Sequence, residues 1–253
     1  MIKLKNNTLG NGMPAIAVSF SNNCSVEEIK ALKKQGLDIA EIRVDLFTGK
    51  IFAKNIIEEL QKFGDLDVPT ILTFRPKREG GNWGGSDAER VVIIAECYQY
   101  ADIVDIETSS IHSLDCSEKF CQLANAILKS ETQLLLSYHN FEKTPSLVAI
   151  NHEIESAEVL LSAKADIVKV ACQVDSNADR VVLTEMLLHS GDKNLVVIGM
   201  GGWGLITRLS FATYGSLFTF AYVGNTITAP GQLHIDATVA YLEDFYPAYT
   251  ARK

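Results

Sequence analysis

The sequence predicts a (β/α)8 barrel, which is a closed ring of eight parallel strands surrounded by eight helices. Strand-like and helix-like segments alternate strictly along the chain, a pattern that indicates a parallel sheet covered by helices. Three similar segments, 37–41, 101–105 and 165–169, place an aspartate at positions 38, 102 and 166, a step of 64 residues each time. Because each step contains one further strand, a strand–helix unit takes about 32 residues. Eight units would take roughly 256 residues, and the chain has 253.

The individual strands and helices are predicted from local patterns. Short apolar runs rich in β-branched residues predict strands near residues 14–20, 38–45, 69–75, 102–107, 133–139, 165–171, 194–199 and 216–220. Amphipathic segments predict helices near residues 25–35, 52–63, 86–100, 114–129, 146–160, 177–190, 203–212 and 234–246. Capping signals support three helix starts: Ser25 precedes Val-Glu-Glu, Ser86 forms a capping box with Glu89, and Pro145-Ser146 opens the fifth helix.

The residues before the first strand, with Gly10 and Gly12, are expected to form a short hairpin that closes the floor of the barrel. No linker rich in Pro, Gly or Ser and no low-complexity segment interrupts the sequence. We therefore expect residues 1–253 to form a single (β/α)8-barrel catalytic domain.

The composition excludes several classes of protein. Hydrophobic residues make up 47% and charged residues 21%, which is ordinary for a soluble globular protein. The sequence begins without an apolar signal segment and contains no apolar run long enough to span a bilayer. A formal charge of −8 and a pI near 5.2 disfavour nucleic acids and anionic membranes as partners.

The cysteines and histidines show no spacing typical of a metal site. The five cysteines are odd in number, and the pair Cys116/Cys121 has no second pair to complete a site. Buried free thiols in a reducing cytoplasm are the favoured interpretation. We expect no metal and no cofactor.

Polar side chains recur at the carboxyl ends of five predicted strands. Residues two apart in a strand share a face, and by this rule the following side chains point towards the barrel axis: Glu41, Arg43, Asp45, Thr73, Arg75, Asp105, Glu107, Ser137, His139 and Lys169. Active sites of this fold lie at the carboxyl ends of the strands. The alternative is a structural layer of ion pairs, but burying so many charges without a functional need would be costly.

Two of these side chains suggest particular chemistry. Lys169 lies between Val168 and Val170 in an apolar strand, where desolvation lowers the pKa of an amine and frees it to form an imine with a carbonyl compound. His139 stands where a strand leaves the barrel, and an imidazole transfers protons near neutral pH. The alternatives are a salt-bridged or snorkelling lysine and a histidine with structural hydrogen bonds only.

The segment Gly199–Gly204 fits the pattern G-x-G-x-x-G. It is a poor dinucleotide motif because it comes late in the chain and no acidic residue follows at the usual distance. In a barrel, the loop after the seventh strand commonly binds anions through backbone amides. Arg208, one turn into the next helix, would add a charge-assisted contact to a carboxylate.

Seven short phrases, in order along the chain, resemble the type I 3-dehydroquinate dehydratases over about residues 14–240. The phrases are 41–45, 73–75 with 79–81, 105–107, 137–141 with 144–145, 165–169, 200–208 and 229–232. The resemblance implies a TIM barrel that dehydrates 3-dehydroquinate to 3-dehydroshikimate without a cofactor, in the shikimate pathway. It also implies a cytoplasmic homodimer that acts on a small molecule.

The resemblance further implies a role for individual residues. Lys169 would form a Schiff base with the ring ketone, His139 would transfer the protons of a syn elimination, and Glu79 and Asp105 would orient and tune His139. The implied substrate-binding residues are Glu41, Arg43, Arg75, Met200, Arg208, Phe220, Thr228, Ala229 and Gln232. The loop before Gln232 would act as a lid.

Three details depart from the family's pattern or stay open. Thr228 stands where a lid serine is common, and the stretch Gly224–Thr228 carries an extra residue. The sequence leaves two roles for Trp203, a substrate contact or a packing contact. Two other functions compete: an imine-forming aldolase barrel, which would need a site for carbon–carbon cleavage, and a non-catalytic barrel, which would be expected to lack Lys169 or His139.

Overall fold

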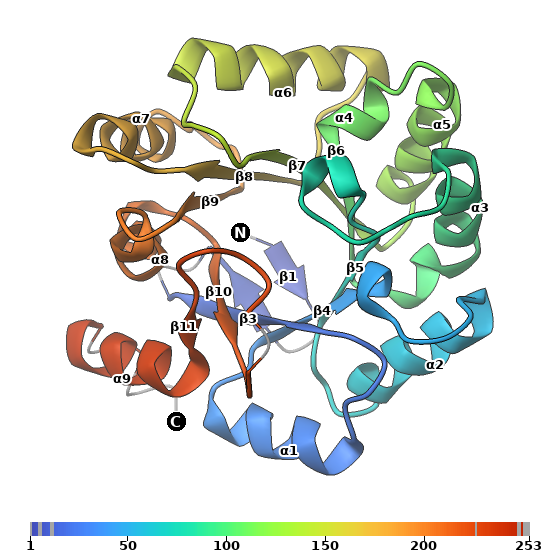
Figure 1. Ribbon diagram of the computed structural model, residues 1–253, viewed down its shortest axis with the longest axis horizontal. Helices are drawn as coiled ribbons and strands as arrows, with labels where there is room; N and C mark the ends of the chain where they lie inside the picture. The colour runs from blue at the N-terminus through green and yellow to red at the C-terminus, as the bar shows by residue number, and fades with distance from the viewer. Residues whose placement is uncertain (1, 5–6, 11–12, 226, 247–248, 250–253) are drawn as a thin grey trace.

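Eight parallel strands form a ring in the computed structural model of the chain, with the helices around its outside (Figure 1). The structure describes residues 2–4, 7–10, 13–225, 227–246 and 249. The ring consists of β3 (Ala15–Phe20), β4 (Ile39–Arg43), β5 (Thr70–Thr73), β6 (Ile103–Glu107), β7 (Gln133–Asn140), β8 (Ile167–Gln173), β9 (Leu195–Met200) and β10 (Phe218–Tyr222). A backbone hydrogen bond of 2.8 Å from Leu217 N to Leu195 O joins the last two strands. The predicted barrel is confirmed. A short extra strand, β11 (Leu233–His234), pairs with β10 on the side away from β3.

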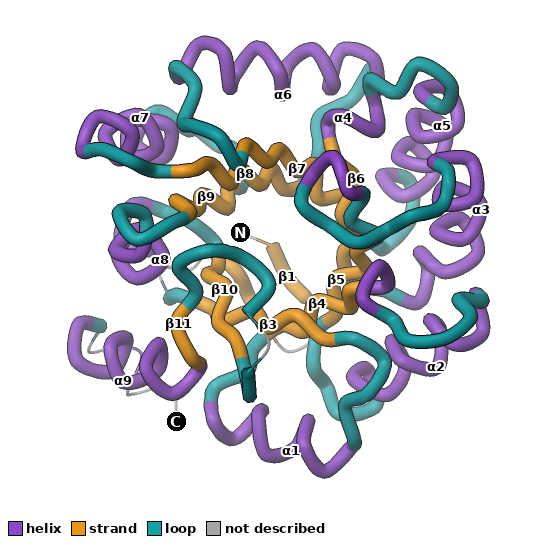
Figure 2. Tube along the Cα trace, viewed as in Figure 1, coloured by secondary structure: helices purple, strands orange, loops and turns teal. Residues whose placement is uncertain are grey.

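A helix follows each strand of the ring, as Figure 2 shows. These helices are α1 (Val26–Gln35), α2 (Ala53–Gly64), α3 (Asp87–Cys97), α5 (Ser117–Leu128), α6 (Leu147–Leu161), α7 (Asn177–Leu188), α8 (Leu205–Ser210) and α9 (Ile235–Phe245). The predicted caps are confirmed: Ser25 and Ser86 each form a capping box, and the Ser146 side chain caps α6. The sequence did not predict the one-turn helix α4 (Thr108–Ile111) or the 3₁₀ turn η2 (Lys77–Glu79). None of the helices formed by the described residues is long and apolar enough to cross a membrane.

The amino-terminal hairpin closes one end of the ring. It consists of β1 (Ile2–Leu4) and β2 (Asn7–Leu9), which pair antiparallel. Ile2, Leu4 and Leu9 are buried in one apolar cluster with the inward side chains at the start of the barrel strands. The predicted plug is confirmed for these residues, whereas Gly12 lies outside the described residues.

The interior of the barrel changes from apolar to polar along the strands. The layer above the hairpin contains Ala17, Ile39, Ile71, Ile103, Leu135 and Ile167. Two residues further along the same strands, the next layer contains Ser19, Glu41, Thr73, Asp105, Ser137 and Lys169. A separate apolar core between the sheet and the helices supports this arrangement from outside. The period of two residues therefore places all these polar groups at the carboxyl end of the ring.

The three aspartates that repeat in the sequence have the same structural role. Each carboxylate accepts a hydrogen bond from a backbone N–H at the start of the preceding strand. The bonds run from Ile16 to Asp38, from Thr70 to Asp102 and from Leu134 to Asp166, and each is 2.8 Å long. The repeat of 64 residues thus reflects a tie between strands at the floor of the barrel.

Candidate active site

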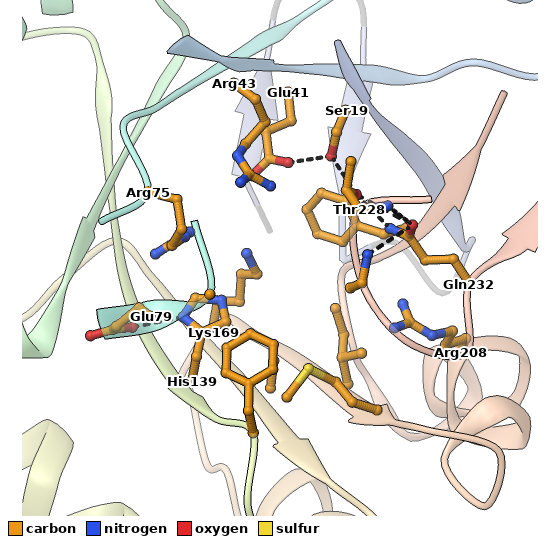
Figure 3. Close-up of a pocket in the computed structure, with 17 residues that line it drawn as sticks. Ser19, Glu41, Arg43, Arg75, Glu79, His139, Lys169, Arg208, Thr228 and Gln232 are labelled. Carbon is orange, nitrogen blue, oxygen red and sulfur yellow. Dashed lines mark hydrogen bonds and ion pairs between the residues drawn. The ribbon is translucent and has the colours of Figure 1, made fainter. Parts of the chain in front are cut away.

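A pocket opens at the carboxyl ends of the strands (Figure 3). It contains about 480 Å³ of empty space, its mouth included, which suits a small ring compound. Of the predicted site residues, the pocket is lined by Glu41, Arg43, Arg75, Glu79, His139, Lys169, Met200, Arg208, Phe220, Thr228, Ala229 and Gln232. Asp105 lies behind the lining, against Lys169. The structure adds lining residues that the sequence analysis missed: Ser19, Gly80, Phe141, Ala171 and Ile198.

The amine of Lys169 is buried in this pocket. Its side chain is 7% exposed, with Nζ 3.6 Å from the Asp105 carboxylate and 4.8 Å from the centre of the Phe220 ring. Burial lowers the pKa of Lys169 below its ordinary value, and the positive charge of Arg75 adds to this effect, although Asp105 opposes it. Lys169 therefore loses its proton more readily than an exposed lysine does.

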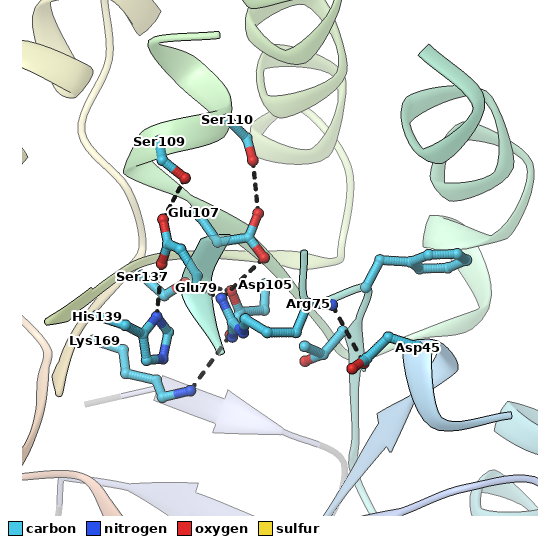
Figure 4. Close-up of polar contacts among 12 residues, drawn as sticks. Asp45, Arg75, Glu79, Asp105, Glu107, Ser109, Ser110, Ser137, His139 and Lys169 are labelled. Atoms are coloured by element: carbon cyan, nitrogen blue, oxygen red, sulfur yellow. Dashed lines mark hydrogen bonds and ion pairs between the residues drawn. The ribbon is translucent and has the colours of Figure 1, made fainter. Parts of the chain in front are cut away.

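His139 is paired with Glu79 in the same pocket (Figure 4). The distance between His139 Nδ1 and Glu79 Oε2 is 2.8 Å. Burial, and then the positive charges of Arg75 and Lys169, hold the pKa of His139 well below its ordinary value, so the imidazole is neutral at neutral pH. When Nδ1–H donates to the Glu79 carboxylate, the lone pair of Nε2 is free to accept a proton. Burial, followed by repulsion from Glu107, raises the pKa of Glu79 to about 7.

Arg75 holds the carboxylates beneath the pocket. It donates to Asp105, to Glu107 at 2.9 Å and to Ser137 at 2.8 Å. Burial by itself would raise the pKa of Asp105, but the charges of Arg75 and Lys169 outweigh it, and the net pKa lies below the ordinary value. Asp105 is therefore a carboxylate that faces Lys169 and Arg75. It forms ion pairs with the lysine and Arg75, and the role at His139 that the resemblance implied stays a prediction.

Glu41 and Arg43 form the wall of the pocket on the side of β4. Ser19 and Thr73 donate hydrogen bonds to the two oxygens of Glu41. Arg43 forms two hydrogen bonds with Asp45, of 2.8 and 2.7 Å. The burial of Arg43 would lower its pKa, yet the bond to Asp45 and the charge of Glu41 raise it. Both side chains are thus fixed in ionic or hydrogen-bonded networks before any ligand arrives.

Arg208 is a buried cation with unused donors. Its Nη2 donates to Pro230 O at 2.9 Å, whereas Nε and Nη1 are buried without a hydrogen-bond partner. Burial lowers the pKa of Arg208 to about 10. A guanidinium in this state favours an anionic ligand, because an anion would give a partner to donors that otherwise have none.

The segment from Thr228 to Gln232 covers this part of the pocket as a small closed turn. Gln232 Oε1 accepts from the backbone amides of Thr228 and Ala229, at 2.9 and 3.2 Å. Gly231 has φ +78°, and a Cβ there would lie 2.6 Å from Gly201 O, so the close approach to the neighbouring loop requires glycine. The extra residue that the sequence suggested between Gly224 and Thr228 stays a prediction, because position 226 lies outside the described residues.

Three amides of the glycine-rich loop after β9 are already used within the protein. The amides of Gly199, Gly201 and Gly204 already donate to Thr207 Oγ1, Pro230 O and Gly201 O, respectively. Arg208, in the helix that follows this loop, lines the pocket. Trp203 is 56% exposed and lies against Arg180, with 5.5 Å from the guanidinium carbon to the ring centre. Its contact is one of packing, since it is not part of the pocket lining.

The described residues contain no group of three His, Cys, Asp or Glu side chains that could hold a metal ion. The five cysteines are free thiols, of which Cys97, Cys116 and Cys172 are buried. The fold and the pocket together define a barrel enzyme in which an amine, a neutral imidazole and a buried arginine face one cavity.

The comparison with known proteins gives the family. Residues 15–246 match the model of the type I 3-dehydroquinase family. The chain is similar to the 3-dehydroquinate dehydratase of Methanothermobacter thermautotrophicus, with 35% identity over 214 residues, which are 84% of this chain and 87% of the relative. It is also similar to that of Methanocella arvoryzae, with 34% identity over 88% of this chain and 93% of the relative. The chain therefore belongs to the type I 3-dehydroquinase family.

Solved structures agree with this assignment. The type I 3-dehydroquinate dehydratase of Clostridium difficile is 28% identical, with a TM-score of 0.82 over 98% of both chains. The 3-dehydroquinate dehydratase of Geobacillus kaustophilus is 27% identical, with a TM-score of 0.83 over 97% of this chain and 96% of that one. The predicted family and fold are both confirmed.

Proposed function

We propose that this type I 3-dehydroquinase converts 3-dehydroquinate to 3-dehydroshikimate through a Schiff base on Lys169. The observation that carries the proposal is the position of the Lys169 amine. It is buried, has a lowered pKa, and shares a pocket with the neutral imidazole of His139 and with the unpaired donors of Arg208. A buried amine with these neighbours is suited to attack a ketone that carries a carboxylate.

The reaction begins at the ring ketone. The Lys169 amine adds to the carbonyl carbon, and loss of water gives a protonated imine. Nε2 of His139 then removes a proton from the carbon beside the imine, and the electron pair moves into the imine to give an enamine. His139 next returns this proton to the departing hydroxyl, so that water leaves from the same face. Hydrolysis of the conjugated imine releases the product and restores the amine of Lys169.

The charged groups around Lys169 support each step. Asp105, 3.6 Å from the amine, offsets the positive charge of the imine. Glu79 accepts the Nδ1–H of His139 and stabilises the imidazolium that forms when the proton is taken up. General acid–base catalysis of this kind contributes about 10²–10⁴-fold to a rate.

The remaining lining residues would bind the substrate. Arg208 would bind the carboxylate through a donor that has no partner in the protein. Glu41, Arg43 and Arg75 would bind ring hydroxyls, and Met200 and Phe220 would form apolar walls. The turn that contains Thr228, Ala229 and Gln232 would act as a lid that excludes water from the imine.

The comparisons support dehydration over the alternatives. The Clostridium difficile relative was crystallised with covalent modified comenic acid, which is compatible with covalent chemistry in the family. An aldolase would need a site for carbon–carbon cleavage, and a non-catalytic barrel would not need a buried lysine beside a histidine–glutamate pair. We further propose, from the family resemblance, that residues 1–253 act as one domain in a cytoplasmic homodimer of the shikimate pathway.

Borohydride trapping tests the Schiff base directly. The protein is incubated with 3-dehydroquinate, reduced with borohydride and analysed as intact protein and as peptides by mass spectrometry. We expect one substrate-derived adduct on the peptide that contains Lys169. The adduct is expected to accumulate in His139→Ala, because that variant forms the imine but eliminates slowly.

Two lysine variants serve as controls. Lys169→Arg retains the positive charge and cannot form an imine, so it should give no adduct. Lys164→Ala removes an exposed lysine just before the same strand and should be labelled like the wild type. An unmodified Lys169 in a protein that still turns over 3-dehydroquinate would refute the imine, whereas absence of turnover in the folded wild type would refute the proposed function.

A further inference from the structure

The Glu79 carboxylate has a second hydrogen-bond partner on the side away from the pocket. Glu79 Oε2 contacts His139, and Glu79 Oε1 accepts a hydrogen bond from the hydroxyl of Ser109 (Figure 4). Ser109 belongs to the one-turn helix α4, which follows β6 directly. It does not line the catalytic pocket. Instead it lines a groove on the outside of the barrel together with Arg78, Asp87 and other residues.

Arg78 fixes the direction of this hydrogen bond. Its Nε donates to Ser109 Oγ at 3.2 Å, and its guanidinium is held by Asp87 at 3.0 Å. The Ser109 oxygen thus accepts a hydrogen bond from Arg78, so its own hydrogen is directed towards Glu79. Through Ser109, Arg78 therefore directs a hydrogen-bond donor towards Oε1 of the Glu79 carboxylate.

The protonation state of the Glu79 carboxyl group decides which nitrogen of His139 carries the proton. While Glu79 is a carboxylate, it can accept only, and Nδ1 of His139 must be the donor. Nε2 is then free to act as the base. If Glu79 were protonated, it could donate to Nδ1 and move the ring proton to Nε2, which would block the base.

The surroundings of Glu79 otherwise favour the protonated form. The side chain is buried, and Glu107 and Asp105 on β6 repel its charge, while Arg75 after β5 attracts it. On β7, the titratable side chains of His139 and Tyr138 also interact with Glu79. The bond from Ser109 favours the carboxylate. A charge-assisted bond from a hydroxyl can decide such a balance, because the raised pKa of Glu79, about 7, lies close to neutral pH.

We propose that Ser109 is a positioning residue for the reaction, because its hydroxyl, directed by Arg78, keeps Glu79 as an acceptor and so holds His139 in the tautomer with Nε2 free. This inference rests on the proposed function, since it assigns His139 as the base. It concerns a residue outside the pocket, which touches neither Lys169 nor the space where the substrate would bind.

The test is Ser109→Ala, compared with the wild type over a range of pH. Loss of the hydroxyl raises the pKa of Glu79, so the acid limb of kcat should move up by about one pH unit. Below that limb kcat should fall about tenfold, and at high pH it should return to the wild-type value. KM should stay nearly unchanged, because the pocket lining is intact.

Two further variants separate positioning from a general structural effect. Ser109→Thr retains the hydroxyl and should restore the wild-type pH profile. Ser113→Ala removes a different hydroxyl of the same groove, which donates to Asp87 at 3.2 Å, and should leave the pH profile unchanged. A uniform loss of kcat at every pH in Ser109→Ala, or no shift of the limb, would overturn the proposal.

Nitrogen NMR of the histidine ring provides a readout that needs no substrate. In the wild type near neutral pH, His139 should carry its proton on Nδ1, and in Ser109→Ala a larger fraction should carry it on Nε2. An identical tautomer in both proteins would refute the role of Ser109 even if the enzyme is active. Conversely, a shifted tautomer in a protein that does not turn over 3-dehydroquinate would support the hydrogen-bond series and reject the proposed function.

Discussion

Glu107 offers a strong test of the electrostatic reasoning, because it is a fully buried carboxylate between two buried arginines. Its oxygens lie 2.9 Å from Arg75 Nη1 and 2.7 Å from Arg90 Nη1, and its side chain is 0% exposed. The substitution Glu107→Gln preserves the shape and removes the charge. The amide oxygen can still accept from one guanidinium, but the other loses its acceptor, because the amide NH2 group places donors where a donor already points.

The expected magnitude follows from the burial of these pairs. Removing one partner of a buried ion pair costs about 3–5 kcal/mol, a large part of a total stability of about 5–15 kcal/mol. For a chain of this size, the midpoint of thermal unfolding should fall by about 6–20 °C. Urea unfolding followed by circular dichroism would give the free energy, and the thermal midpoint would provide a second measurement.

Glu58→Gln is the matched control, because it makes the same chemical change at an exposed ion pair. Glu58 lies 3.7 Å from Lys54, and the two side chains are 62% and 84% exposed. Such a pair contributes about 0.3–0.5 kcal/mol. If Glu107→Gln lost no more stability than Glu58→Gln, the claim that Glu107 holds Arg75 and Arg90 together would be refuted.

Three more results are expected. Arg208→Lys should raise KM about 10–100-fold with a smaller change in kcat, since charge-assisted hydrogen bonds contribute about 1.5–3 kcal/mol. Initial rates at varied substrate concentration would measure both constants. An unchanged KM would reject carboxylate binding by Arg208. Gly80→Ala should reduce activity, because the backbone has φ +74° and the new Cβ would lie 2.3 Å from the Phe141 ring in the pocket wall. Normal activity in this variant would show that Phe141 moves aside freely. The rate of borohydride trapping at Lys169 should rise with pH and reach its plateau below the pKa of an ordinary lysine. Burial lowers the pKa of this amine, and only the free amine attacks. A plateau reached only at the pKa of an ordinary lysine would contradict the effect of burial.

The sequence predicted most of the fold because the local signals agree with the barrel. Apolar runs place all eight strands of the ring, and capping boxes such as Ser25 with Glu28 mark helix starts. The short helix α4 was missed, since its four residues show no apolar period and follow directly on Glu107. Its existence matters, because it carries Ser109.

The site was predicted where the strand period exposes it and missed where the loops form it. Lys169 and His139 follow the period of two along β8 and β7. Phe141 lies beyond the end of a strand, and Ser19 looks like one more small residue of an apolar run, so neither stands out in the sequence. The partner of Asp105 could not be predicted either, because the choice between Lys169 and His139 depends on side-chain directions that the spacing along the chain does not fix.

The hairpin β1–β2 determines from which end of the barrel small molecules can enter and leave the pocket. It fills one end of the ring with the side chains of Ile2, Leu4 and Leu9, so the pocket communicates with solvent at the opposite end, beside the turn that contains Gln232. On the proposed mechanism, substrate, product and the expelled water all use this opening. With the turn as the proposed lid, it opens once in every cycle, and increasing solvent viscosity should slow turnover wherever that movement is slower than the chemistry.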